Sequence, residues 1–215
     1  MGRINLGMTT ALLVTLAACG GSGGEGTPMV TTPAPVEPAP TPPPTSGDST
    51  MWPARAALLA TYTEPTIYTP LPNIPTSGRA TYDGYFSGQL ADRDDSVTDI
   101  LIGAMTLDVT FRSRTVDVSG SVSGFVDGDD APLSGQLALS AGSLDRGGDP
   151  SVDATLLMTA SGTLRDAQGR DLVIGTRLEG DFLAENHRAV GGEVLGSVRV
   201  DGVDQDFDGG FIAER

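Results

Sequence analysis

The C-terminal stretch of the sequence alternates between apolar or glycine residues and polar residues, and this period of two constrains the fold more than any other feature. It covers residues 190–200 and, after the dipeptide Asp201-Gly202, residues 206–213. Such alternation is typical of strands with one buried face. The Asp-Gly dipeptide between the two runs predicts a tight hairpin, because both residue types tolerate positive φ.

Six further runs with the same period lie between residues 78 and 182. Their expected inward residues begin at Ala80, Leu101, Val116, Leu133, Val152 and Leu172 and end at Leu90, Phe111, Val126, Ala141, Leu164 and Phe182. Turn-forming residues separate the runs at 92–95, 112–114, 127–130, 146–150, 166–170 and 185–188. Eight strands with short connections predict an all-β fold, an antiparallel up-and-down β-barrel, since closure leaves no unpaired strand edge.

The competing architecture is a barrel that faces lipid with its apolar side. Such a barrel needs a continuous apolar band with aromatic residues at both membrane interfaces. Aromatic residues make up only 5% of this sequence, and glycine occupies many positions of the apolar parity. We therefore predict that the apolar side faces inward, where glycines let strands bend and approach closely in a narrow barrel.

Residues 1–18 have the features of a secretory leader, because a positive start is followed by an apolar block too short to span a bilayer. The leader ends in Leu16-Ala17-Ala18-Cys19, which is similar to the lipobox of bacterial lipoproteins, and Cys19 is the one cysteine of the chain. This predicts lipidation at Cys19, with an ordinary leader and an incidental cysteine as the alternative. Gly20 follows the cysteine in place of aspartate, which by the same resemblance favours the outer membrane.

Two segments separate the leader from the barrel. Residues 19–50 are rich in glycine and then in proline, threonine and alanine, which predicts a disordered, extended tether. Residues 51–77 predict an irregular arm with a short helix that has Pro53 at its first position. We expect this arm to lie against the barrel of residues 78–215 and to plug one end, with Trp52 as its anchor rather than as a ligand contact.

The charged and titratable residues exclude several classes of function. The net charge is −15, and the sequence contains no lysine, so nucleic acid is not an expected partner. His187 is the one histidine and is expected in an exposed turn, which leaves no Ser-His-Asp triad and no histidine-rich metal site. Two weak calcium candidates are Asp127 to Asp130 and Asp204 to Gly209, although the outer side of a strand also explains the second. We predict no catalytic residue, no metal site, no cofactor and no enzymatic activity.

Both ends of the predicted barrel resemble a known family. The segments Phe182 to Glu185, Gly191-Gly192 and Phe207 to Arg215, together with residues 78–88, are similar to the closing and opening strands of the transferrin-binding-protein-B-like β-barrel lipoproteins. Ala184 stands where that family has the glycine of its F-x-G motif. The resemblance implies a surface-exposed lipoprotein of the outer membrane that binds a protein or an iron- or haem-related ligand through its loops. It also implies a partner that translocates the chain to the surface.

Other functions stay open at this point. The chain has one predicted barrel and is expected to be a monomer, unlike the two-lobed transferrin receptor. The alternative functions are a structural or stress-protective envelope lipoprotein and a periplasmic carrier of a small apolar molecule inside the barrel. The ligand-binding residues are not identified by the sequence, because loops determine ligand choice and these loops carry no recognisable motif.

Overall fold

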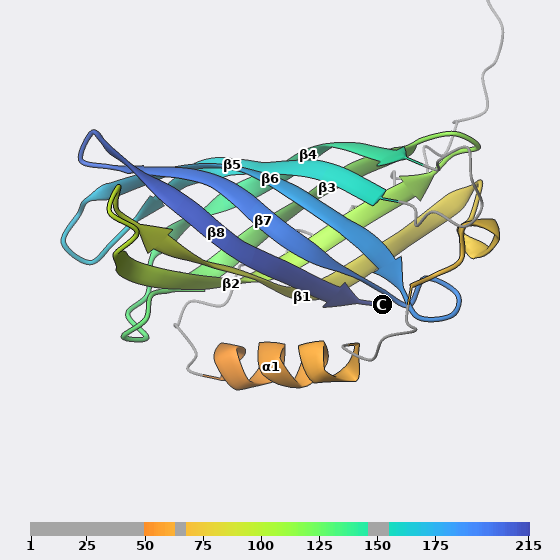
Figure 1. Cartoon of the computed structure of the whole chain (residues 1–215), viewed down its shortest axis with the longest axis horizontal. Coiled ribbons are helices and arrows are strands. Elements are labelled where there is room, and N and C mark those ends of the chain that lie inside the picture. The colour runs from red at the N-terminus through yellow and green to blue at the C-terminus, as the bar shows by residue number, and fades with distance from the viewer. Residues whose placement is uncertain (1–49, 63–67, 146–154) are drawn as a thin grey trace, which may run out of the picture. The chain divides into compact units, whose positions relative to one another are not determined.

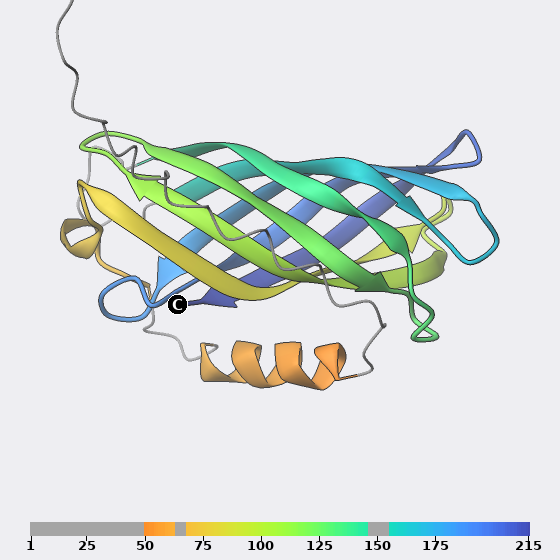
Figure 2. The same ribbon diagram turned by 180° about the vertical axis from the view of Figure 1, so that it is seen from behind.

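The computed structural model describes residues 50–62, 68–145 and 155–215, so the predicted leader, Cys19 and nearly all of the tether lie outside the described residues. Within them, eight antiparallel strands follow one another around a closed barrel (Figure 1). Seen from behind, the strands cross the barrel at a tilt on that side as well (Figure 2). The prediction of an all-β, up-and-down, eight-stranded barrel is confirmed.

Each strand pairs with its neighbours in the chain, and the first strand pairs with the last. The strands are β1 (Gly78–Ala91), β2 (Val97–Phe111), β3 (Val116–Val126), β4 (Ser134–Asp145), β5 (Thr155–Arg165), β6 (Asp171–Leu183), β7 (Ala189–Val200) and β8 (Val203–Glu214). Phe86 of β1 lies opposite Phe211 of β8 where the ring closes. The one α-helix of the described residues, α1 (Met51–Thr61), lies outside the barrel along β1, β2 and β8, and a short 3-10 turn, η1 (Leu71–Asn73), precedes β1.

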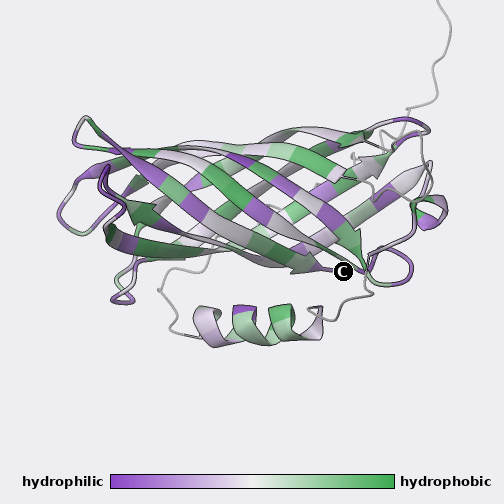
Figure 3. Cartoon of the chain, viewed as in Figure 1, coloured by the Kyte–Doolittle hydropathy of each residue, from purple (hydrophilic) through white to green (hydrophobic). Residues whose placement is uncertain are grey.

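The apolar parity faces the barrel interior, as the alternation predicts. Figure 3 shows hydrophobic and hydrophilic residues alternating along the strands. Inside, the ring of Phe86 stacks on Phe207 with centroids 5.6 Å apart and meets Phe125 edge-on at 6.1 Å. Phe111 and Phe182 pack together with centroids 5.6 Å apart. Each such side chain contributes about 1.5–3 kcal/mol when fully buried, so the packed interior holds the ring together.

The inward prediction fails at the end of β3. The register between β2 and β3 shifts between Ile102 and Ala104, and Gly124 has a φ of 64°. This bulge inserts one residue, so Phe125 points into the core while Val126, expected inward, lies outside beside Ile102. The two neighbours Phe125 and Val126 are both apolar, and the sequence alone therefore does not reveal the change of side.

A second bulge corrects the prediction for β4. Ala141, expected inward, is exposed and has a φ of 57°, and the register with β5 shifts between Ser140 and Ser143. Leu144 takes the inward position instead and is buried in the core. The expected inward residues Val152 and Ala154 lie outside the described residues.

The strands β1 and β8 approach each other closely where the ring closes. Gly88 and Gly209 lie opposite each other in their register. A Cβ atom on Gly209 would lie 2.5 Å from the Cα of Gly88 and closer still to the carbonyl oxygen of Ser87. Only a glycine fits without moving the neighbouring backbone, which supports the expected architectural role of the inward glycines.

The predicted arm lies at the end of the barrel where β6 ends. Tyr68 forms a bridge with Leu183, and the backbone N–H and hydroxyl of Thr69 donate to the carbonyl oxygens of Phe182 (2.8 Å) and Ala184 (2.6 Å). Ile74 is 3% exposed and belongs to the core cluster. We call this end, with the β6–β7 loop at residues 184–188, the arm end.

The helix in front of the arm starts earlier than expected. It begins at Met51, so Pro53 is its third residue rather than its first. The first helical hydrogen bond is donated by Ala54 to the carbonyl of Thr50 at 3.0 Å. Because the first N–H groups of a helix have no intrahelical partner, Pro53 is accommodated at this position without the loss of a hydrogen bond. Trp52 is half-buried beside Met51, Ile102 and Val126.

Candidate functional site

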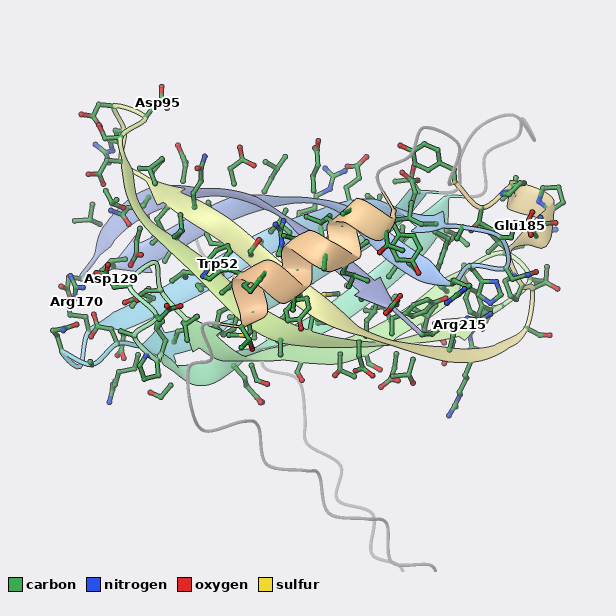
Figure 4. The ribbon with its side chains drawn as sticks, turned by 90° about the horizontal axis from the view of Figure 1, so that it is seen from below. Trp52, Asp95, Asp129, Arg170, Glu185 and Arg215 are labelled. Carbon is green, nitrogen blue, oxygen red and sulfur yellow. The ribbon has the colours of Figure 1, made fainter. Side chains whose placement is uncertain are left out.

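Four connections gather at the end of the barrel opposite the arm end, and we call this the loop end. They join β1 to β2, β3 to β4, β5 to β6 and β7 to β8, at residues 92–96, 127–133, 166–170 and 201–202. In Figure 4, Asp95, Asp129 and Arg170 lie at the loop end, whereas Glu185 and Arg215 lie at the arm end. The sequence predicted a ligand site in loops, and these loops leave the barrel at the end that no other described segment covers.

Three of these loops share one construction. In each, the amide of the first residue donates to the carbonyl of the fifth, and the fourth residue has a left-handed backbone. The amide bonds are Asp92 to Ser96 (3.0 Å), Asp127 to Ala131 (3.1 Å) and Asp166 to Arg170 (3.1 Å), and the left-handed residues are Asp95, Asp130 and Gly169. These are tight hairpin loops of the kind that a type I turn and a left-handed residue form.

The first aspartate of two of these loops is used to build the loop itself. One carboxylate oxygen of Asp127 accepts the amides of Asp129 (3.0 Å) and Ala131 (2.8 Å). Asp166 accepts the amides of Gln168 (2.9 Å) and Arg170 (2.8 Å) in the same way. The predicted turns at 127–130 and 166–170 are confirmed, and these two carboxylates stabilise the backbone rather than offering a free contact.

The predicted Asp201-Gly202 hairpin is also present. It joins Val200 to Val203, which lie opposite each other, and its two central residues have φ values of 50° and 84°. Positive φ at both positions is what the tightest hairpins require.

Several aspartates remain free at the loop end. The side chains of Asp95, Asp129, Asp130 and Asp201 are exposed, and among the described residues none of them has a hydrogen bond or an ion-pair partner. Other acids at this end are neutralised locally by the pairs Arg165–Asp171, Arg170–Asp166 and Arg199–Asp204. The loop end therefore carries a negative surplus on short, well-bonded loops, a surface that suits a positively charged partner.

The pKa of the Asp166 carboxyl reflects its hydrogen bonds within the β5–β6 loop. Burial raises the pKa of Asp166, but the amide and guanidinium of Arg170 and the amide of Gln168 lower it, and the pKa lies below its ordinary value. The carboxylate accordingly stays charged under physiological conditions, and its loop keeps the same hydrogen bonds.

The barrel mouth at the loop end is small. Its hollow has a volume of about 140 Å³, with Leu90, Leu133 and Leu172 towards the core and Asp99 and Asp166 among the polar lining. Pockets that bind small molecules usually measure about 300–1,000 Å³. The core below is filled by aromatic and aliphatic side chains. This geometry does not favour a carrier that holds its cargo inside the described part of the barrel.

His187 does not lie in an exposed turn, and that prediction is wrong. It is 8% exposed, and its ring meets Phe111 edge-on with centroids 5.4 Å apart. The hydroxyl of Tyr82 donates to the carbonyl of His187 at 3.1 Å, and the imidazole Nδ1 is buried with no hydrogen-bond partner among the described residues. A left-handed backbone with φ of 50° turns the ring over the arm end of the barrel. His187 therefore covers the core at this end, packed against Phe111.

The burial of His187 predicts a pH-dependent stability. Burial and then the nearby charge of Arg215 lower the pKa of His187 from its usual 6.5. Below that value the unfolded chain takes up a proton that the folded chain resists, so the free energy of unfolding should fall as the pH drops from 6.5 to the lower folded pKa. Urea unfolding at about pH 7.5 and pH 5.5 measures this loss, which should shrink in His187→Phe. An equal loss in both proteins would assign the effect to other groups.

One acid of each calcium candidate has a structural role, Asp127 within its own loop and Asp204 in an ion pair. Asp204, Asp206 and Asp208 lie along the outer side of β8, and Asp204 pairs with Arg199 at 2.7 Å. The strand interpretation of this segment is therefore correct. Among the residues that the structure describes, no group of three or more His, Cys, Asp or Glu side chains could hold a metal ion.

Comparison of the chain with protein-family models, with curated proteins and with solved structures gave no match. In the described part of the chain, no helix has both the length and the apolar character needed to cross a membrane.

Proposed function

We propose that this chain is a surface-displayed lipoprotein of the outer membrane whose barrel binds a protein partner through the loop end. One observation carries the proposal: the barrel interior is filled by its own side chains and the arm end is covered, so binding is left to the outer surface. At the loop end, which no other segment among the described residues covers, exposed carboxylates lie on short loops held by their own hydrogen bonds. The resemblance at the two ends of the barrel sequence supports the same role.

A protein fits the loop end better than an iron- or haem-related ligand does. The mouth, at about 140 Å³, is below the usual size of a small-molecule pocket. A larger hollow of about 610 Å³ between the β1–β2 and β7–β8 loops is lined mainly by charged residues, whereas small-molecule pockets are mostly apolar. Haem proteins usually ligate iron through histidine, cysteine, methionine or tyrosine, and the one histidine is buried at the opposite end. Exposed aspartates suit a partner surface that carries lysine or arginine, since complementary charge raises the association rate. The proposal assigns no catalytic step to this chain.

The anchor and the display are part of the proposal and rest on the sequence. Acyl chains on Cys19 would hold the chain to the membrane, because each buried methylene contributes about 0.8 kcal/mol. Translocation to the surface by a partner protein belongs to the same proposal. Protease added to intact cells should remove the barrel, and Cys19→Ser should release the protein from the membrane fraction. Full protection in intact cells would contradict display at the surface.

Recognition through the loop end is tested by removing its free charges. In one variant, asparagine replaces Asp95, Asp129 and Asp130, because asparagine tolerates the left-handed backbone of these loops. The matched control changes three exposed acids elsewhere, with Glu185→Gln, Glu193→Gln and Asp208→Asn. A pull-down with the full chain should recover the same partner with the wild type and the control.

With the loop variant, recovery of that partner should fall about tenfold, and added salt should weaken capture by the wild type. Equal recovery by the loop variant and the control would refute recognition through these carboxylates. An absorbance scan of the purified chain checks the other ligand class, since a haem band would favour a haem ligand over a protein.

A further inference from the structure

The helix α1 stands as a ridge on the outer wall of the barrel, along β1, β2 and β8. At its start, Met51 is buried against Ile102 and Val126. Just after its end, the hydroxyl of Tyr62 donates to a carboxylate oxygen of Glu214 at 2.9 Å. Figure 4 shows the helix lying across the barrel with Trp52 near its first turn.

A groove of about 630 Å³ runs along one side of this ridge, and we call it the α1 groove. Its helix side consists of Ala54, Ala57, Leu58 and Thr61. Its wall side consists of Asp83, Gly84, Tyr85, Ala104, Met105, Thr106 and Glu214. The helix residues have the spacing i, i+3, i+4 and i+7, which is one face of a helix. Ala57 and Thr61 are exposed, so this face of α1 has no covering element among the described residues.

Two acids of the same charge face each other in the α1 groove. Asp83 of β1 lies directly opposite Glu214 of β8, and both are exposed. Like charges opposite each other on neighbouring strands destabilise a sheet. Asp83 accepts the hydroxyl of Thr106 at 2.8 Å, but within the described part of the chain neither carboxylate has an ion-pair partner. A guanidinium or ammonium group from outside would relieve this repulsion.

We propose that the α1 groove is the docking site for a helix of a partner protein, which lays an apolar stripe beside α1 and directs arginine or lysine to Asp83 and Glu214. The partner should supply the basic residues, because the groove lining contains two acids and no arginine or lysine. The closed barrel offers no free strand edge, so a partner strand cannot extend the sheet and side chains must carry the recognition. The small residues Ala54 and Ala57 let a partner backbone come close.

The test uses the full chain and a synthetic peptide of about 18 residues, long enough for five helical turns, with a leucine and alanine stripe that ends in arginines. A second peptide has glutamates in place of the arginines. Fluorescence anisotropy of the labelled arginine peptide should show saturable binding, about tenfold tighter than that of the glutamate peptide. The double variant Asp83→Asn, Glu214→Gln should lose the same factor, whereas Asp208→Asn should bind like the wild type.

A matched pair on the helix locates the contact. Ala57→Glu should abolish binding because Ala57 lines the groove, while Ala56→Glu should preserve it because Ala56 is exposed on the same helix but is not part of the groove lining. The loop variant of the preceding section should bind the arginine peptide normally, which separates this site from the loop end.

Absence of saturable binding overturns the proposal, and so does equal loss in the two alanine variants. Two other occupants would also overturn it. Self-association of the chain that Ala57→Glu abolishes would assign the groove to a second copy, and Ala57-dependent binding to phosphatidylglycerol vesicles would assign it to a lipid surface.

Discussion

Replacing Phe211 by aspartate is expected to abolish the β-sheet circular dichroism signal of the barrel. Phe211 is 1% exposed and lies between Phe86 of β1 and Gly192 of β7, in the strand that closes the ring. The change removes about 1.5–3 kcal/mol of stabilisation that comes from burying the phenylalanine side chain. It also places a charge in the core, which lowers the free energy of unfolding by several kcal/mol more. Since a whole domain is stable by only about 5–15 kcal/mol, we expect the variant not to fold.

The control for Phe211→Asp introduces an aspartate on the outer face of the barrel. Val173 of β6 is 49% exposed and lies opposite Thr163 and Arg199, so Val173→Asp should change the free energy of unfolding by less than about 0.5 kcal/mol. Far-UV circular dichroism and urea unfolding compare the two proteins. A well-folded Phe211→Asp would mean that β8 does not close the barrel.

Replacing Gly209 by alanine is expected to reduce the free energy of unfolding by about 3 kcal/mol or more. The added methyl group would lie 2.5 Å from the Cα of Gly88, and the carbonyl oxygen of Ser87 would be closer still. Both are backbone atoms, which cannot rotate away as a side chain can. The β1 and β8 strands would have to separate at the point where they complete the ring.

The same substitution at Gly175 provides the control. An added Cβ there has no atom within 4 Å, and its φ is not positive. Gly175→Ala should therefore leave stability unchanged within about 0.5 kcal/mol or raise it slightly by restricting the unfolded chain. Urea unfolding of both variants measures the difference. Similar stability of the two would show that β1 and β8 can move apart freely.

The number of strands and the side that faces inward could be predicted, because burial of one face imposes a period of two on the sequence. The two bulges in β3 and β4 could not be predicted. At residues 124–126 an apolar pair, Phe125 and Val126, supports either side, and at Ala141 a small residue fits inside or outside. Which residue a bulge adds depends on the register with the neighbouring strand, and the sequence of one strand does not contain that information.

The candidate sites were predictable only in part. Aspartate and glycine indicate turns, but which carboxylates cap their own loop and which stay free depends on the folded backbone. The position of His187 depends on a left-handed backbone that its residue type does not require. The sequence does indicate where an element covers the outer wall. Ile102 and Ile212 are bulky apolar residues on the outward parity, and both are buried. Such residues indicate that another element covers the wall.

The pairing of β1 with β8 joins residues from the two extremes of the folded region, as in the pair Asp83 and Glu214. No subset of strands made earlier during synthesis can form this seam, so the ring has to wait for its last strand to leave the ribosome. Contacts between such distant residues form slowly. The first and last strands therefore pair only when all eight strands are present, so the barrel acquires its closed hydrogen-bond network in one late step.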